Sequence, residues 1–459
     1  MDLSQQKQNR IVLGFILVSG LVLFYNLLPK SLEYHGYLRY AEIAREMIRS
    51  GDWIVPHHNG GIYVDKPPLI FWLMAIPSWF HGAVTPLIAR LPSALSAWAG
   101  VVILFYWGRR IYGAVQSGLI SGGLCLVSYQ YFFEGRNSKA DMLLCLLTVL
   151  SLYLFYLGYD TDRRKSFLLY GLSFFCMGLG VLTKGPLGMV IPFLIVIAFL
   201  LKERQLKILV SKEFLVGYVV LAIIALPWFI LFIQKVGWEQ TIALVKSNRV
   251  LTRRAPIYFY FLGIWLEFLP LSLLLPSLFV HLWRKRDGRL QPGESFLIIW
   301  FVLLFVLLTL FPFRASRYLL PALPPLALLA GGMLRKRFPH VVVAFCLFVL
   351  IWHGVEWHRV RQSPFRSPGM ALAGELRPVV GEEIVSGYKL DVGTLEEINF
   401  YLDRVIPILK ENKHLPGKKF ILMPENAYHD LQARRHGSLH LLREFRYRGG
   451  RLFLISTVD

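Results

Sequence analysis

The sequence predicts an α-helical integral membrane protein that carries a small α/β domain at its C-terminal end. Hydrophobic residues make up 55% of the 459 residues, charged residues make up only 17%, and the apolar residues gather in long runs. A water-soluble chain could not shield that much apolar surface. After Trp357 the composition becomes mixed and polar for about 100 residues, which is the size of a small domain. We therefore expect a membrane domain over residues 1–356 and a soluble domain over residues 357–459.

About eleven apolar runs come close to the ~20 residues that a helix needs to cross a bilayer. They lie at roughly 11–28, 87–106, 114–132, 142–158, 166–182, 186–201, 214–234, 257–280, 294–310, 317–334 and 340–356. The first run lacks a small-residue cleavage site, so we interpret it as a retained span. The run from Ile70 to Phe80 is too short to cross and contains Pro77, which favours a re-entrant or interfacial segment. The four cysteines lie inside apolar runs and are expected to be buried hydrophobes.

The net charge of +21 lies in short clusters between the apolar runs. Anionic lipid head groups explain such clusters, so we expect membrane lipids and no nucleic acid as partners. With eleven spans, the clusters near 7–10, 109–110, 163–165, 202–212, 284–289 and 335–337 share one side, which the positive-inside rule makes cytoplasmic.

The loops on the opposite side are cationic as well, which the positive-inside rule does not predict. Snorkelling to lipid phosphate explains any one of these cations, but their number favours an anionic ligand on that outer face. The cations are Arg39, Lys66, Arg136, Lys139, Lys184, Lys246, Arg249, Arg253, Arg254, Arg314 and Arg317.

A polar stretch near the start of the chain runs from Glu33 to Leu69, between apolar runs. Within it, the segment Leu38 to Ser50 repeats apolar residues at helical spacing, with charged residues off that face, and Gly51 ends it. This pattern predicts a helix that lies in the membrane interface. The apolar face consists of Leu38, Ala41, Ala44, Met47 and Ile48. The stretch closes with Asp65-Lys66-Pro67-Pro68, where the prolines favour an extended backbone.

The C-terminal segment shows the alternation of strands. We expect strands within 383–390, 419–423, 439–447 and 452–456, with Gly449-Gly450 closing a hairpin between the last two. Helices are expected at 370–380 and 427–435. An odd number of spans places this domain outside the cytoplasm.

Three carboxylates have both a functional and a structural interpretation. Asp141 begins an apolar run, where it can simply complement a helix dipole. Asp65 beside Lys66 can be a loop ion pair of little energetic value. Glu267 lies within an apolar run, where an unpaired charge costs at least ~2.5 kcal/mol, so it must be partnered or neutral; Pro270 breaks the same helix.

The functional interpretation is stronger when the polar residues at the outer membrane edges are considered together. The carboxylates there are Asp65 and Asp141, and the cations are Lys66, Lys184 and Arg314. Cations can hold a phosphate as it leaves, while carboxylates orient the attacking oxygen or a divalent metal ion. The set therefore suits transfer chemistry on a phosphorylated lipid.

Several motifs resemble those of the bacterial aminoarabinose transferase and protein mannosyltransferase group of GT-C glycosyltransferases. They are Arg39-Tyr40-Ala41-Glu42-Ile43-Ala44-Arg45-Glu46-Met47, Ser50-Gly51-Asp52-Trp53, Asp65-Lys66-Pro67-Pro68, Ala89-Arg90-Leu91-Pro92-Ser93, Leu182-Thr183-Lys184-Gly185-Pro186, Pro227-Trp228 and Tyr318-Leu319-Leu320-Pro321-Ala322-Leu323-Pro324-Pro325. The resemblance implies a GT-C fold, a polyprenyl-phosphate sugar as donor and a periplasmic site in the bacterial inner membrane. By motif match, Lys66 would hold the donor phosphate, with Lys184 and Arg39 as further candidates. Asp141 would be an active-site acid, and Arg314 would replace the cation that precedes the Tyr-x-x-Pro segment.

The chain departs from the family pattern at one position of the first loop. The family places Asp-Glu three and two residues before the Arg-Tyr pair, and this chain has Gly36 and Tyr37 there. Glu33, His35 and Asp65 are the nearby groups that could replace the family aspartate, and we expect catalysis to involve Asp65, Asp141 and Glu33.

Three functional hypotheses follow. The leading one is an inverting sugar transfer from undecaprenyl phosphate to a periplasmic acceptor such as lipid A, another glycan or a protein. A transporter or flippase would instead place ionisable residues near the membrane midplane and show repeated halves. The third is a relative that binds polyprenyl phosphate without catalysis, because Gly36 stands where the family has its aspartate.

Overall fold

The computed structural model describes residues 3–25, 27, 38–161, 163–247, 255–285, 290–343, 347, 351, 354, 368–409, 420–434 and 440–456. The chain forms two compact units. The first comprises Met1–Leu27, Val64–Leu73 and Arg90–Trp357, and the second comprises Leu28–Tyr63, Met74–Ala89 and His358–Asp459. The second unit therefore contains two N-terminal segments that the sequence analysis placed with the membrane domain.

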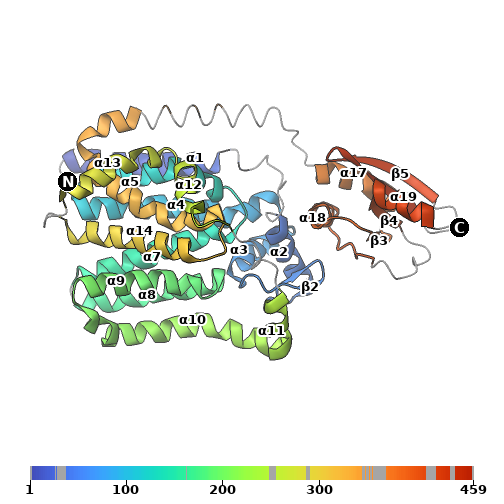
Figure 1. Cartoon of the computed structure of the whole chain (residues 1–459), viewed down its shortest axis with the longest axis horizontal. Coiled ribbons are helices and arrows are strands. Elements are labelled where there is room, and N and C mark those ends of the chain that lie inside the picture. The colour runs from blue at the N-terminus through green and yellow to red at the C-terminus, as the bar shows by residue number, and fades with distance from the viewer. Residues whose placement is uncertain are drawn as a thin grey trace. The chain divides into compact units, whose positions relative to one another are not determined.

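The chain is predominantly helical, as the sequence predicts for an integral membrane protein (Figure 1). Six helices of the described residues are long and apolar enough to cross a membrane. They belong to α1 (Leu3–Phe24), α4 (Pro86–Tyr112), α7 (Ala140–Tyr159), α8 (Arg163–Lys184), α10 (Lys212–Val236) and α14 (Pro292–Leu310). Three shorter apolar helices are α3 (Leu69–His81), α5 (Val115–Val127) and α9 (Leu187–Lys202). Most of the predicted span 340–356 lies outside the described residues.

Two further apolar segments are sharply bent. The predicted span 257–280 is not one helix: α12 (Phe259–Glu267) meets the segment of η3 (Leu271–Leu274) and α13 (Leu275–Lys285) at 107°. Pro270 explains this break, because a proline has no backbone N–H donor and its ring clashes with the preceding helical turn. The segment of η4 (Ser316–Ala322) and α15 (Leu323–Met333) bends by 69° against the helix that follows it, which begins at η5 (Arg335–Arg337). If each bent pair is one span, the described residues hold up to eight spans.

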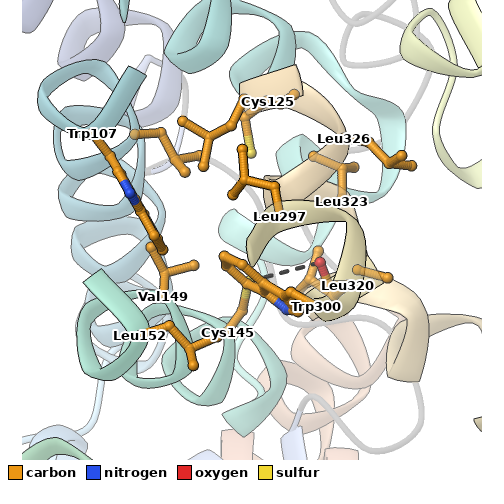
Figure 2. Packing of buried hydrophobic residues seen from close by; sticks show 14 of the residues in the cluster. Trp107, Cys125, Cys145, Val149, Leu152, Leu297, Trp300, Leu320, Leu323 and Leu326 are labelled. Carbon is orange, nitrogen blue, oxygen red and sulfur yellow. Dashed lines mark hydrogen bonds between the residues drawn. The ribbon is translucent and has the colours of Figure 1, made fainter. Parts of the chain in front are cut away.

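The core of the first unit is a continuous aromatic and aliphatic cluster between the helices. Trp107 of α4 stacks on Trp300 of α14 with ring centroids 5.7 Å apart, and both rings are fully buried (Figure 2). Cys145 of α7 lies beside them, and its thiol approaches the carbonyl oxygen of Leu320 at 3.8 Å. Large aromatic rings supply much of the packing energy of such a core. The cluster thereby fixes α7, α14 and the Leu320 turn against one another.

The cysteines and one glycine pair show how closely the helices pack. Cys125, Cys145 and Cys176 are free and buried, as predicted for small hydrophobes. Helices α8 and α9 approach through Gly180 and Gly188, where a Cβ on Gly188 would lie 2.0 Å from the carbonyl carbon of Gly180. Neither position therefore has room for a side chain.

The second unit contains the predicted α/β domain. Its sheet has the order β3-β4-β6-β5, in which β3 pairs parallel to β4 and the other two pairings are antiparallel. The strands are β3 (Val385–Gly387), β4 (Phe420–Pro424), β5 (His440–Tyr447) and β6 (Gly450–Ser456), and the helices are α17 (Pro368–Val380), α18 (Val392–Leu402) and α19 (Glu425–Arg434). Helix α18 was not predicted from the sequence, although Asp391 caps it by accepting from the Gly393 and Thr394 amides at 3.0 and 3.1 Å.

Helix α2 (Leu38–Ser50) forms where the spacing of apolar residues predicts it. The charged residues Glu42, Arg45 and Glu46 of this helix are buried, which the spacing of apolar residues does not show. Arg45 binds Glu42 on its own helix and Asp403 at the end of α18, the latter at 3.0 Å. The apolar pattern alone cannot show that a charged face is also covered.

A short hairpin of β1 (His57–His58) and β2 (Gly61–Ile62) follows α2. Its turn residues, Asn59 and Gly60, have φ values of 53° and 74°, the left-handed conformation that tight hairpin turns require. Their amides donate to the two carboxylate oxygens of Glu46 at 2.6 and 3.1 Å. The hairpin is therefore held against α2.

Candidate active site

Asp141 is the centre of a buried charge cluster in the first unit. It lies in the first turn of α7 and is 4% exposed. Lys184, in the last turn of α8, places its Nζ 2.5 Å from Asp141 Oδ1, and Arg317 Nε of η4 lies 3.5 Å from Oδ2. An acid at a helix N-terminus and a base at a C-terminus both complement their helix dipoles. The packing of α7 against α8 thus brings the predicted Asp141 and Lys184 into direct contact.

The aromatic ring of Tyr318 contacts both cations, Lys184 and Arg317. The Lys184 ammonium lies 4.4 Å from its ring centroid, and the Arg317 guanidinium carbon lies 5.4 Å from it. A cation over an aromatic face gains roughly 0.5 to 2 kcal/mol, more when it is shielded from water. The Tyr318 ring therefore helps to position the side chains of Lys184 and Arg317 against Asp141.

Lys66 is the third cation of this cluster. Its Nζ donates to the Asp65 carbonyl oxygen at 2.8 Å. Burial lowers the pKa of Lys66, and the charge of Lys184 lowers it further, whereas Asp65 and Asp141 act in the opposite direction. Because the charges of Lys184 and Asp141 both change its pKa, Lys66 lies in the same electrostatic environment as these two residues. Lys66, Lys184 and Arg317 together thus favour an anion beyond what the carboxylates neutralise.

Glu134, near the end of α6 (Tyr129–Gly135), is a carboxylate that the sequence analysis did not single out. It is 7% exposed, and its Oε2 has no hydrogen-bond partner among the described residues. A buried polar group without a partner costs about 1–3 kcal/mol, more when it is charged. Its place seven positions before Asp141 was visible in the sequence, but its burial was not.

Arg314 and Arg317 have different surroundings from those the motif suggests. The resemblance pointed to Arg314 as the phosphate cation, yet its guanidinium donates to the backbone carbonyl oxygens of Ala255 and Thr309, the latter at 2.6 Å. Arg317 makes the contact with Asp141. Its position directly before Tyr318 was the sequence signal that could have identified it.

The remaining predicted site residues lie elsewhere or outside the described residues. Arg39 belongs to the second unit, where its Nε lies 2.9 Å from Oε1 of the buried Glu396, and His58 Nε2 lies 3.3 Å from the same oxygen. Burial favours the neutral acid at Glu396, but hydrogen bonding to His58 and the Arg39 charge hold its pKa below the usual value. Glu33, like His35 and Gly36, lies outside the described residues.

The cluster does not fit a divalent metal ion. Both oxygens of Asp141 face cations, which would repel a metal ion. The described part of the chain also holds no group of three His, Cys, Asp or Glu side chains that could ligate one.

Known proteins resemble this chain in both sequence and structure. The family described as dolichyl-phosphate-mannose-protein mannosyltransferase matches residues 65–230. An uncharacterized protein of Aquifex aeolicus is 30% identical over 73% of this chain and 67% of its own length. An undecaprenyl phosphate-alpha-4-amino-4-deoxy-L-arabinose arabinosyl transferase of Sodalis glossinidius is 33% identical over 65% of this chain and 54% of its own. Its counterpart in Edwardsiella ictaluri is 27% identical over 71% and 60%. The chain thus spans between half and about two thirds of these relatives.

Solved structures show the same fold. ArnT from Cupriavidus metallidurans, in a crystal structure bound to undecaprenyl phosphate, matches with a TM-score of 0.78 at 20% identity over 97% of both chains. The archaeal oligosaccharyltransferase AglB from Archaeoglobus fulgidus matches with a TM-score of 0.59 at 12% identity, over 90% of this chain and 69% of its own. With the sequence relatives, these matches place the chain among integral membrane proteins. The chain belongs to the bacterial aminoarabinose transferase and protein mannosyltransferase group of GT-C glycosyltransferases.

Proposed function

We propose that this protein is an inner-membrane glycosyltransferase that moves a sugar from undecaprenyl phosphate to a periplasmic acceptor such as lipid A, another glycan or a protein. The observation that carries the proposal is the buried Asp141 with Lys184 and Arg317 against it, and Lys66 in the same electrostatic environment. Lys66, Lys184 and Arg317 bring three cations to the site, which suits a lipid phosphate. The names of the relatives support this donor.

The cations would act on the donor phosphate. As the bond between sugar C1 and the phosphate oxygen breaks, negative charge grows on that oxygen, and preorganised cations stabilise it most at that moment. Asp141 orients Lys184 and Arg317, and Asp65 holds Lys66 through its backbone carbonyl. An acceptor oxygen that attacks C1 from the opposite face would invert its configuration.

The distribution of charge favours transfer over transport. The cations meet at the N-terminal end of α7 and the C-terminal end of α8, whereas a flippase would need ionisable groups near the middle of its spans. The non-catalytic alternative rests on Gly36, and it predicts that the protein binds undecaprenyl phosphate without forming product.

The test is sugar transfer from a purified undecaprenyl-phosphate sugar in proteoliposomes that contain candidate acceptors. Losing one charge-assisted contact costs about 1.5–3 kcal/mol, so we expect Lys184→Ala to lower transfer roughly 10- to 100-fold. The matched control is Arg110→Ala, because Arg110 pairs with Asp160 at 2.8 Å just beyond the other end of α7. Those two acids are about 28 Å apart along the helix.

Three outcomes distinguish the hypotheses. Product that depends on Lys184 and not on Arg110 supports transfer. Donor that crosses the vesicle membrane without product supports a flippase. Binding of undecaprenyl phosphate without product or movement, for every acceptor class, supports the non-catalytic relative.

A further inference from the structure

The proposed transfer leaves one role unassigned, which is the group that takes the proton of the acceptor. Asp141 cannot easily take it, because Lys184 and Arg317 occupy its two oxygens. Gly36, at the position of the family aspartate, offers no carboxylate. Glu134 does, because it is buried and its Oε2 has no hydrogen-bond partner in the described part of the chain. A buried polar atom without a partner in a native protein calls for an explanation, and a catalytic role is one.

Helix α6 holds Glu134 beside the charge cluster. The Gln130 side chain donates to the Ser316 carbonyl oxygen, the residue directly before Arg317. The Tyr129 amide donates to the Leu269 carbonyl oxygen at 2.8 Å, which fixes the start of α6. Only the short segment 136–139 separates the end of α6 from the start of α7. Glu134 is thus attached through its own helix to both segments that carry Asp141 and Arg317.

The charges that act on Glu134 come from Lys139 before α7, from Asp141 on α7, from Arg317 on η4 and from Lys184 on α8. Burial and, to a smaller extent, the Asp141 carboxylate raise the pKa of Glu134, and Lys139, Arg317 and Lys184 lower it. With all of them the pKa is about 7. A carboxylate that binds and releases a proton near neutral pH is matched to proton transfer. Asp141 contacts two cations and is suited instead to orienting them.

We propose that Glu134 is the catalytic residue that accepts the proton of the acceptor hydroxyl during sugar transfer, an inference that rests on the proposed function. The acceptor oxygen forms a bond to sugar C1 while its proton passes to Glu134 Oε2. The bond between C1 and the phosphate oxygen breaks, and its electron pair stays on the phosphate, which the cations hold. Glu134 then releases the proton to water, so that atoms and charge balance.

The test is the pH profile of kcat for transfer in proteoliposomes. For the wild type, we expect kcat to rise with pH through about 7, because the deprotonated form of Glu134 is the active one. Glu134→Gln should lower kcat by ~10²- to 10⁴-fold and remove this rise, with little change in KM for the donor. Glu134→Asp keeps a carboxylate and should restore part of the rate together with the pH dependence.

Two controls separate chemistry from folding. Binding of undecaprenyl phosphate, measured as a shift in the melting temperature, should be the same for Glu134→Gln and the wild type. Glu213→Gln changes a buried glutamate in the first turn of α10, outside the cluster, and should keep the wild-type pH profile.

Specific results overturn the inference. Unchanged kcat and pH dependence in Glu134→Gln would do so, as would a Glu134→Asp enzyme no better than the glutamine variant. Loss of the rise in Asp65→Asn, with Glu134→Gln unaffected, would assign the proton to Asp65. Wild-type protein that forms no product overturns the proposed function itself, which distinguishes that failure from the others.

Discussion

Glu134 and Asp141 are separated by six residues, yet their surroundings give them different chemistry. Asp141 has a cation on each oxygen, whereas one oxygen of Glu134 has no hydrogen-bond partner among the described residues. The sequence singles out Asp141 at the start of an apolar run and does not show that Glu134 is buried. Only the fold, which brings Lys184 and Arg317 to one of the two, decides which acid stays charged and which can exchange a proton.

Lys66 should make donor binding sensitive to alkaline pH. Burial, and then the charge of Lys184, lower the pKa of Lys66 below its ordinary value. The protonated form holds phosphate, so affinity should weaken as pH rises towards that lowered pKa. In Lys66→Arg this weakening should be smaller, because a guanidinium stays protonated throughout. Binding of undecaprenyl phosphate to protein in nanodiscs, measured between about pH 7 and 10, checks it.

Lys202→Ala is the control for Lys66, because Lys202 is exposed and pairs with Glu203 at the end of α9. It should bind the donor as the wild type does at every pH. The same pH dependence in Lys66→Arg and the wild type would mean that another group titrates.

Glu42 should make the second unit more stable at acid than at neutral pH. Burial raises the pKa of Glu42 to about 7, although the nearby Arg45 charge opposes this. A raised folded-state pKa gives stability that is present below the unfolded value of 4.5 and is lost as pH rises to about 7. The loss is at most about 3 kcal/mol. Melting temperatures should therefore fall over this window in the wild type and fall less in Glu42→Gln.

The control for Glu42 is Glu375→Gln in the same unit. Glu375 is exposed and pairs with Arg443 at 3.5 Å, so its replacement should leave the wild-type pH dependence intact. A Glu42→Gln protein whose melting temperature follows the wild type across the window would remove Glu42 as the cause.

Helices α8 and α9 should not tolerate a methyl group where their backbones meet. In Gly188→Ala the new Cβ would lie 2.0 Å from the carbonyl carbon of Gly180, so the helices must separate. Overpacking of this kind costs about 1–3 kcal/mol. Gly171→Ala is the control on α8, because a Cβ there meets nothing within 4 Å and should gain about 0.5–1 kcal/mol. Thermal unfolding in one detergent should show the first variant below the wild type and the second at or above it; equal values for both would contradict the close contact.

Helix α18 should hold the first loop through Glu396. This buried carboxylate faces Arg39 and His58, and its replacement by Gln removes the charge on which both depend. Because Arg39 is partly exposed, the cost should fall below the ~3 kcal/mol typical of a fully buried pair. Trypsin should cleave faster after the half-exposed Arg49 of α2 in Glu396→Gln.

Glu382→Gln offers a matched control, since Glu382 is fully exposed and pairs with Arg404 at 3.0 Å in the same unit. It should leave cleavage after Arg49 unchanged. Equal cleavage of the Glu396→Gln and Glu382→Gln proteins would show that Glu396 does not hold the loop.

Local patterns predicted the elements well where one segment decides its own structure. Helical spacing located α2, and alternation with a Gly-Gly turn located the β5–β6 hairpin. The single span predicted over 257–280 is wrong, because it is two helices bent at Pro270. The burial of the charged face of α2 depends on its ion-pair partners and could not be predicted. A local sequence pattern predicts neither the partner of a helix face nor the angle of a bend.

For the candidate site, too, the sequence identified individual residues but not their contacts with residues far away in the chain. Motifs pointed to Lys66, Asp141 and Lys184 one at a time, and the structure joins Lys184 to Asp141. The choice between Arg314 and Arg317 depended on which side of a turn faces α7, which a linear motif does not encode. Glu134 could not be found from the sequence, because its significance comes from burial and the lack of a partner for Oε2.

The two ends of α7 should lie on opposite sides of the membrane. Lys139 precedes its N-terminus, while Arg110 pairs with Asp160 just beyond its C-terminus. Reporter fusions after Arg110, Arg164, Arg204 and Arg286 should report cytoplasm, and those after Gly60, Lys139 and Gly437 should report periplasm. A cytoplasmic signal after Lys139 would invert the proposed orientation of the site.

The second unit joins residues that the ribosome makes far apart in time. Arg45 of α2 and Asp403 at the end of α18 are 358 positions apart. At roughly 5–20 residues per second, the first loop emerges ~20 to 70 s before its partner helix exists. During that interval the charges of Glu42 and Arg45 have no protein cover from α18. Nascent chains that stop before residue 392 should therefore leave this loop open to proteases or dependent on a chaperone.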